Sequence, residues 1–269
     1  MDIVLIAGLW LDASTWDDLA AELRALGHRP VPVSLPGQRR DTSSEADRST
    51  AAGAESSESV SSGSVSTGSA SSGPASTESA SSGPASATLA DQVEAVLAAV
   101  DESSAPALVV GHSAAATLAW MAADARPEKV ATAVLVGGFP ATDGSTYADF
   151  FEPVGGQVAF PGWDFFEGPD SADLDEGGKA RFAMEAIAVP EAVTRGVVHL
   201  TDERRYSVPI LMVCPEYSVQ DAKAWVQAGE LPEVARAEQV DYVDIDSGHW
   251  PMLTRPAEFA RILADAATR

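Results

Sequence analysis

The stretch ALVVGHSAAATLAW, residues 107–120, decides the fold of this chain. ALVVG is a short apolar run of the kind that forms a buried strand, and AAATLAW predicts a helix directly after it. Between them stands Ser113, in a G-x-S-x-G pattern whose last glycine is replaced by Ala115. A serine at this point either caps a buried helix or presents a nucleophile on a sharp turn. The small residues Gly111 and Ala115 favour the nucleophile, because strand and helix backbones approach closely there and a larger side chain would clash.

Strands and helices alternate along the chain on both sides of this stretch. Further strands are predicted at residues 2–8, 29–37, 131–138, 208–214 and 240–246. Helices are predicted at residues 14–26, 87–100, 114–125, 221–230 and 256–268. This alternation predicts a mostly parallel sheet with helices on both faces, which is a three-layer α/β domain.

Two segments interrupt the alternation. Residues 42–87 are almost all Ser, Ala, Gly, Thr and Glu, and they repeat every ten residues with Gly53, Gly63, Gly73 and Gly83 in register. Such a composition has too little apolar surface to offset the entropy of ordering, so a disordered insertion is predicted. Residues 141–205 are irregular and crowd together the aromatic residues Tyr147, Phe150, Phe151, Phe160, Trp163, Phe165 and Phe166. The core is therefore predicted at residues 1–140, outside the insertion, and 206–269.

The composition excludes several classes of partner. The chain has 40 acidic residues against 17 basic ones, and its formal net charge of -23 repels nucleic acid. No apolar run is long enough to cross a membrane, and the start, MDIVLIAGLWLD, lacks the basic region of a signal peptide, so a cytoplasmic protein is expected. Cys214 is the single cysteine and the histidines are scattered, so neither a disulfide nor a metal site is predicted. We expect no cofactor, a small-molecule substrate, no membrane partner, and a monomer or homodimer.

A serine hydroxyl is a weak nucleophile until a base removes its proton. His249 is the candidate base, because it lies just after the last predicted strand, at the same edge of the sheet as Ser113. The side chain of His112, inside the serine turn, is expected to point away from the pocket. The negative charge that develops during attack needs backbone donors. We expect these at the amide of Ala114, directly after the serine, and at the amide of Leu9, in the loop after the first strand.

These pieces together resemble the α/β-hydrolase family, specifically the small-esterase branch that includes plant methylesterases and hydroxynitrile lyases. The resemblance rests on AGLWLDASTW (7–16), ALGHRPVPVSLPG (25–37), GHSAA (111–115) and GHWPMLTRPAEF (248–259). It covers nearly all of the chain except residues 42–87 and, weakly, the middle region. The chain departs from the branch at Ala7, where a histidine usually precedes the glycine. The resemblance implies that residues 141–205 form a cap over the active site, whose aromatic residues either line a substrate pocket or fill the cap's own core.

The resemblance also implies a carboxylate that orients the histidine, in a G-x-x-D pattern after residues 208–214. Here residues 214–218 read CPEYS, with Ser218 where the aspartate is expected. Asp143, after the preceding strand, is the preferred candidate, because some family members place the acid there. Glu216 is the alternative, since its longer side chain could compensate for its early position.

The resemblance therefore implies a serine hydrolase with Ser113, His249 and Asp143 as its triad. Such an enzyme would cleave a small, largely apolar carboxylic ester through an acyl-enzyme intermediate. Hydroxynitrile lyases of this branch place a lysine after the histidine, but Trp250 stands there instead, which makes lyase chemistry a poorer match. Two alternatives remain open. A hydrolase of carbon–carbon bonds would use the same triad, and a non-catalytic member of the fold that binds a small ligand would explain the displaced acid.

Overall fold

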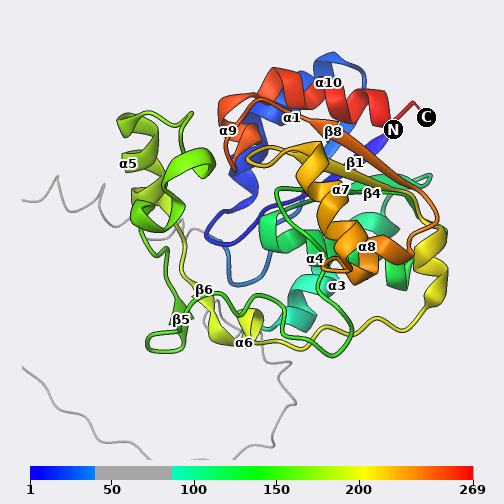
Figure 1. Cartoon of the computed structure of the whole chain (residues 1–269), viewed down its shortest axis with the longest axis horizontal. Helices are drawn as coiled ribbons and strands as arrows, with labels where there is room; N and C mark the ends of the chain where they lie inside the picture. The colour runs from blue at the N-terminus through cyan, green and yellow to red at the C-terminus, as the bar shows by residue number, and fades with distance from the viewer. Residues whose placement is uncertain (40–86, 269) are drawn as a thin grey trace, which may run out of the picture. The chain divides into compact units, whose positions relative to one another are not determined.

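The computed structural model describes residues 1–39 and 87–268, and Figure 1 shows how their helices and strands are arranged. Within these ranges a six-stranded sheet has the order β2-β1-β3-β4-β7-β8. The strands are Asp2–Ile6 (β1), Arg29–Pro32 (β2), Ala107–His112 (β3), Val130–Val136 (β4), Ile210–Cys214 (β7) and Val240–Asp244 (β8). All neighbours in this sheet pair in parallel, so the predicted parallel sheet is confirmed.

Helices cover both faces of the sheet. Helix α1 (Asp17–Ala25) packs against α10 (Pro256–Ala266), and α3 (Leu89–Asp101) packs against α4 (Ala116–Ala125). In Figure 1 the first pair lies at the top and the second pair lies lower, with strands β1 and β4 between them. The remaining helices of the core are α7 (Val219–Ala228) and the shorter α8 (Pro232–Arg236) and α9 (Pro251–Thr254). The three-layer α/β fold is therefore confirmed.

The topology brings the loops after β1 and β3 together. Strand β1 lies between β2 and β3, so the chain leaves β1 in one direction to form β2 and returns on the other side as β3. In open parallel sheets, ligands bind at such a reversal of strand order, outside the carboxyl ends of the strands. Every residue of β3 is buried, which matches its unbroken apolar sequence. The loop after β1 and the turn after β3 therefore share the edge where a site is expected.

The segment from 141 to 205, which we call the cap segment, contains one ten-residue helix and otherwise short elements. They are β5 (Gln157–Val158), β6 (Val189–Pro190), α5 (Glu176–Glu185), α6 (Glu191–Thr194) and the 3-10 turns η4 (Trp163–Phe166) and η5 (Gly168–Asp170). Strands β5 and β6 pair in an antiparallel two-stranded sheet of their own. The indole N–H of Trp10, in the loop after β1, donates to the carbonyl of Val158 at 3.2 Å. The backbone carbonyl of Trp10 accepts from the amide of Ile187 at 2.9 Å. The core loop and the cap segment are thus tied together through one buried tryptophan.

A buried ionic network fixes the end of the cap segment to the core. Arg205, in η6 (Glu203–Ser207), bonds Asp124 of α4 at 3.1 Å and Glu233 of α8 at 3.0 Å, and all three side chains are buried. Asp124 also accepts from the amides of Thr201 and Asp202. Because both carboxylates share this one guanidinium, loss of Arg205 would leave two buried charges without their cation.

The predicted insertion at residues 42–87 lies outside the described residues, except for Ala87. Its two flanks meet: a β-carbon placed on Gly37 would lie 3.1 Å from Cβ of Ala87. Gly37 has a φ of +80°, a conformation that favours glycine. Residues 37 and 87, on either side of the undescribed residues 40–86, therefore lie close together in the core.

Candidate active site

Ser113 lies on a strained turn at the end of β3. Its φ of +55° is in the left-handed region, which non-glycine residues rarely adopt. A β-carbon on Gly111 would lie 2.2 Å from the carbonyl oxygen of Ala115, and one on Gly138 would lie 2.2 Å from that of Ser113. Glycine is thus required at both positions for the backbones to approach. The strain and the close packing match a serine held outward between a strand and a helix.

The loop after β1 packs directly against this turn. A β-carbon on Gly8 would lie 3.0 Å from Cβ of Ser113, so the missing side chain lets the loop reach the serine. The side chain of Gln38 donates to the carbonyls of Gly8 at 2.7 Å and Leu11 at 3.1 Å. In a planar trans peptide, the carbonyl of Gly8 and the N–H of Leu9 point in opposite directions. By binding the Gly8 carbonyl, Gln38 therefore orients the N–H of Leu9 away from the Gln38 side chain.

His249 and Glu216 form a hydrogen-bonded pair at the same edge. His249 follows β8 and Glu216 follows β7, and the distance from Nδ1 to Oε1 is 2.8 Å. The side chains are only 12% and 14% exposed, so the pair is shielded from water. A carboxylate can only accept, so neutral His249 carries its proton on Nδ1, which leaves Nε2 free to accept another.

Two glycines after β4 place the serine turn beside this pair. A β-carbon on Gly137 would lie 3.2 Å from Nδ1 of His249 and 3.3 Å from Oε2 of Glu216, while Gly138 abuts the backbone of Ser113. Gly137 has a φ of +56°. Among the described residues, no hydrogen bond joins the hydroxyl of Ser113 to His249. The serine and the histidine are therefore neighbours across these glycines, with the hydroxyl unbonded to the ring.

Asp143 is not the partner of His249, which corrects the sequence-based preference. Asp143 is exposed and its Oδ1 accepts from the amide of Leu200 at 2.9 Å, within the cap segment. An aspartate that precedes a glycine, as here before Gly144, is a common turn former. The carboxylate at hydrogen-bond distance is Glu216, the alternative left open by the sequence.

Ser218, at the position where the family pattern has an aspartate, caps a helix. Its hydroxyl accepts from the amide of Asp221, whose side chain accepts in turn from the backbone N–H of Ser218. This reciprocal capping box begins α7 two residues after Glu216. The helix therefore starts at the position where the family pattern would place the acid.

A second carboxylate from the cap segment lies beside the pair. The backbone carbonyl of Asp170 accepts from the amide of His249 at 2.8 Å. Burial and the neighbouring Glu216 carboxylate raise the pKa of the Asp170 side chain above its ordinary value, while His249 acts in the opposite direction. Nothing in the sequence pattern singled out Asp170, because it lies in an irregular stretch far from His249 along the chain.

The aromatic residues of the cap segment pack over the histidine. The ring of Phe166 stacks on that of His249 at a centroid distance of 6.3 Å and an interplanar angle of 26°. Trp10 meets Phe151, Phe160 and Phe166 at centroid distances of 5.1 to 5.9 Å. Phe166 is buried, whereas Phe150 and Phe165 are 64% and 60% exposed. The cluster thus reaches from the surface of the cap segment to His249.

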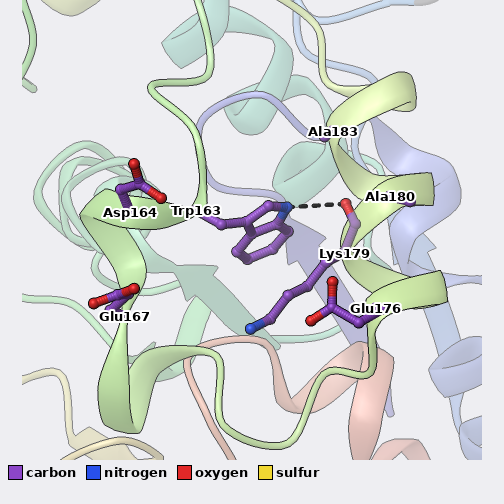
Figure 2. Close-up of a pocket in the computed structure, with 7 residues that line it drawn as sticks. All are labelled: Trp163, Asp164, Glu167, Glu176, Lys179, Ala180 and Ala183. Atoms are coloured by element: carbon purple, nitrogen blue, oxygen red, sulfur yellow. Dashed lines mark hydrogen bonds between the residues drawn. The ribbon is translucent and has the colours of Figure 1, made fainter.

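A pocket of 350 Å³ lies in the cap segment. Its lining consists of Trp163, Asp164, Glu167, Glu176, Lys179, Ala180 and Ala183. Figure 2 shows the indole of Trp163 between the turn that bears Asp164 and helix α5, with its N–H bonded to the carbonyl of Lys179 at 2.9 Å. Neither Ser113 nor His249 lines it, so this pocket is separate from the serine site.

Within residues 1–39 and 87–268, no three His, Cys, Asp or Glu side chains are grouped so that they could hold a metal ion. No described helix is both long and apolar enough to cross a membrane.

The sequence profile of the alpha/beta hydrolase family matches residues 3–262. No curated protein sequence matches the chain significantly. Solved structures with the same fold include an extracellular alpha/beta-hydrolase from a Paenibacillus species, described as sharing structural and functional homology with tobacco salicylic acid binding protein 2. It is 16% identical, with a TM-score of 0.67 and coverage of 99% of this chain and 98% of its own.

Two further structures have similar scores. A pyrethroid hydrolase from Sphingobium faniae is 17% identical with a TM-score of 0.66, over 100% of this chain and 97% of its own. The methylesterase MES16 from Arabidopsis is 13% identical with a TM-score of 0.65, over 100% of this chain and 99% of its own. At these identities the similarity establishes the fold alone.

Proposed function

Because the chain belongs to the alpha/beta hydrolase family, we propose that it is a serine hydrolase that cleaves a small, largely apolar carboxylic ester through an acyl-enzyme intermediate. The observation that carries the proposal is the 2.8 Å hydrogen bond between His249 and Glu216, beside the strained turn of Ser113. A nucleophile, a base and a carboxylate that orients the base are the three groups that acyl transfer by serine requires.

The first half of the reaction forms the acyl-enzyme. The Ser113 hydroxyl oxygen attacks the acyl carbon while Nε2 of His249 takes its proton, and Glu216 stabilises the resulting imidazolium. The tetrahedral intermediate then collapses, the bond from the acyl carbon to the alcohol oxygen breaks, and His249 returns the proton to that oxygen. Hydrogen bonds of catalytic groups are often long without substrate, so we expect the serine–histidine bond to form when substrate binds.

The second half releases the acid. His249 takes a proton from water, whose oxygen attacks the acyl carbon, and the proton passes to the oxygen of Ser113 as the acyl-enzyme bond breaks. In both halves, the amides of Leu9 and Ala114 are the proposed donors to the tetrahedral oxyanion. The approach of Gly8 to Ser113 and the hold of Gln38 on the Gly8 carbonyl support the assignment of Leu9.

An apolar substrate is supported by the aromatic cluster around His249, because aromatic side chains contribute apolar contact area. A methylesterase and a pyrethroid hydrolase among the similar structures agree with an ester substrate. The displaced acid was the reason to consider a non-catalytic binder, and the hydrogen bond between His249 and Glu216 supports a catalytic member instead. A cytoplasmic location and a small-molecule substrate as the main partner remain part of the proposal.

Covalent labelling tests the proposed function. A fluorophosphonate probe should label the folded protein, and Ser113→Ala should remain folded but unlabelled. p-Nitrophenyl acetate and p-nitrophenyl butyrate should be hydrolysed by the wild type and not by Ser113→Ala. A folded wild type that neither reacts with the probe nor turns over either ester would overturn the proposal. Turnover of a β-diketone in place of both esters would point to carbon–carbon hydrolysis by the same residues.

A further inference from the structure

His112, next to the nucleophile, makes a contact that the proposed reaction has not yet used. Its Nε2 lies 2.8 Å from the backbone carbonyl oxygen of His249, a residue 137 positions away in the sequence. His112 is the last residue of β3 and is 1% exposed. The expectation that its side chain points away from the pocket left its partner unidentified, and the structure supplies that partner.

The chemistry of this contact fixes the protonation of His112. A carbonyl oxygen only accepts hydrogen bonds, so Nε2 of His112 must carry the proton. Burial lowers the pKa of His112 to about 3, so the ring is neutral at ordinary pH and its Nδ1 is unprotonated. That Nδ1 is buried and has no hydrogen-bond partner among the described residues. It faces Gly8, where a β-carbon would lie 2.9 Å from it.

The charged and titratable groups around His112 are few. The ring of His249 lies 4.9 Å away between centroids, at an angle of 56°, and the indole of Trp16 lies 6.5 Å away on another side. His249 also lowers the pKa of His112 through charge repulsion. The neutral ring of His112 thus lies between the ring of His249 and the apolar indole of Trp16.

Every polar group of His249 except Nε2 is therefore held. Its amide donates to Asp170 of the cap segment, its carbonyl accepts from His112 of the serine turn, and its Nδ1 is bonded to Glu216. Nε2, the atom that must exchange a proton with Ser113, is the remaining one. The backbone of His112 is joined to Ser113 by a peptide bond, and its side chain is hydrogen-bonded to His249. One residue therefore links the proposed nucleophile to the proposed base.

We propose that His112 is a positioning residue, which sets the place of His249 relative to Ser113 by donating Nε2–H to the His249 carbonyl. This inference rests on the proposed function and deepens it. Without the donor, the carbonyl of His249 would be left unpaired in a buried place and the ring would be held by fewer contacts. A small displacement of a base costs rate without changing substrate affinity to the same extent.

A matched pair of variants tests the proposal. The amide of His112→Gln can reach the position of Nε2 and donate, whereas His112→Met has a similar length and no donor. We expect kcat of His112→Met to fall about 10- to 100-fold with little change in KM, and His112→Gln to recover most of it. The folded fraction, measured by circular dichroism, corrects both values. Equal kcat in the two folded variants would overturn the inference.

A second measurement uses the wild type and does not depend on turnover. With ¹⁵N-labelled histidine, the His112 ring should show one protonated Nε2 and one unprotonated Nδ1 from pH 5 to pH 9, and its signals should vanish in both variants. A His112 that titrates in this range, or carries its proton on Nδ1, would overturn the inference. An inactive wild type with the expected His112 signals would instead count against the proposed function.

Discussion

Glu216 approaches His249 from the loop after β7, with Oε1 2.8 Å from Nδ1, although it stands two residues before the position at which the family pattern has its aspartate. The longer side chain of glutamate spans the difference. Its second oxygen, Oε2, is buried and has no partner among the described residues. The carboxylate is thus committed to the histidine through one oxygen.

Substitution of this carboxylate should reduce catalysis strongly. Glu216→Gln presents an amide to Nδ1 of His249, so the favoured tautomer is lost and the imidazolium is not stabilised. We expect kcat to fall about 10³- to 10⁴-fold, measured with p-nitrophenyl acetate. Asp143→Asn is the matched control, because its carbonyl oxygen can still accept from the Leu200 amide. An equal loss in both variants, or a loss in Asp143→Asn alone, would contradict the assignment.

Gln38 should matter for catalysis although it lies outside the triad. It is 1% exposed, and Gln92 of α3 donates to its side-chain oxygen at 2.9 Å, which leaves its amide N–H groups for Gly8 and Leu11. Gln38→Met removes these donors with little change in size, so the Gly8–Leu9 peptide can rotate. We expect kcat to fall about 10- to 100-fold while KM changes little, measured with the same ester.

The buried Gln92 provides the control for this prediction. Gln92→Met removes the bond to Gln38 and leaves the Gln38 donors to the loop after β1 in place. Its stability should fall by a comparable amount, but its kcat should stay closer to the wild-type value. If Gln92→Met lost as much kcat as Gln38→Met, a general loss of packing would account for both, and a specific role of Gln38 would be excluded.

Local sequence patterns predicted the parts of the site that depend on neighbouring residues. The turn at Ser113 needs a strand, small residues and a helix in succession, and all of these lie within residues 107–120. His249 could be found because it follows the last strand of a parallel sheet, and the carboxyl ends of such strands meet at one edge. The parallel sheet and its helical layers followed from the alternation of strands and helices, whereas the order of the strands came from the structure.

The choice between Asp143 and Glu216 depended on tertiary structure. Both carboxylates follow strands that lie next to each other in the sheet, so their sequence positions are nearly equivalent. Two tertiary features distinguish them. Helix α7 begins directly after Glu216, and the carboxylate of Asp143 accepts a hydrogen bond from Leu200 within the cap segment. The contacts of His112 and Asp170 with His249 could not be predicted from the sequence either, because they join residues 137 and 79 positions apart.

The side chain of Asp170 should make stability depend on pH. Its pKa is raised in the folded protein by burial and by Glu216, so between its ordinary pKa and the raised value the folded state binds more protons than the unfolded state. Stability therefore falls as pH rises through this window. Asp170→Asn removes this ionisation, so its Tm relative to the wild type should increase from pH 4 to pH 7.

The exposed Asp164 is the control for this effect, because it belongs to the same cap segment. Asp164→Asn should give a Tm difference from the wild type that changes much less between pH 4 and pH 7. The backbone carbonyl of residue 170 keeps its bond to His249 in the variant, so the comparison isolates the side chain. A relative Tm of Asp170→Asn that stays constant or declines from pH 4 to pH 7 would show that the carboxylate is not destabilised by its surroundings.

The buried network around Arg205 should contribute far more to stability than an exposed ion pair. Arg205→Met leaves the carboxylates of Asp124 and Glu233 buried without their cation, which costs about 3–5 kcal/mol of unfolding free energy. Arg29→Met removes an ion pair to Asp2 whose arginine is 60% exposed, and this should cost far less, because water screens an exposed pair. Denaturation by urea measures both. Similar costs would mean that water reaches the network, and recovery of stability in Arg205→Met at low pH, where the carboxylates become neutral, would confirm that unpaired charge is the cause.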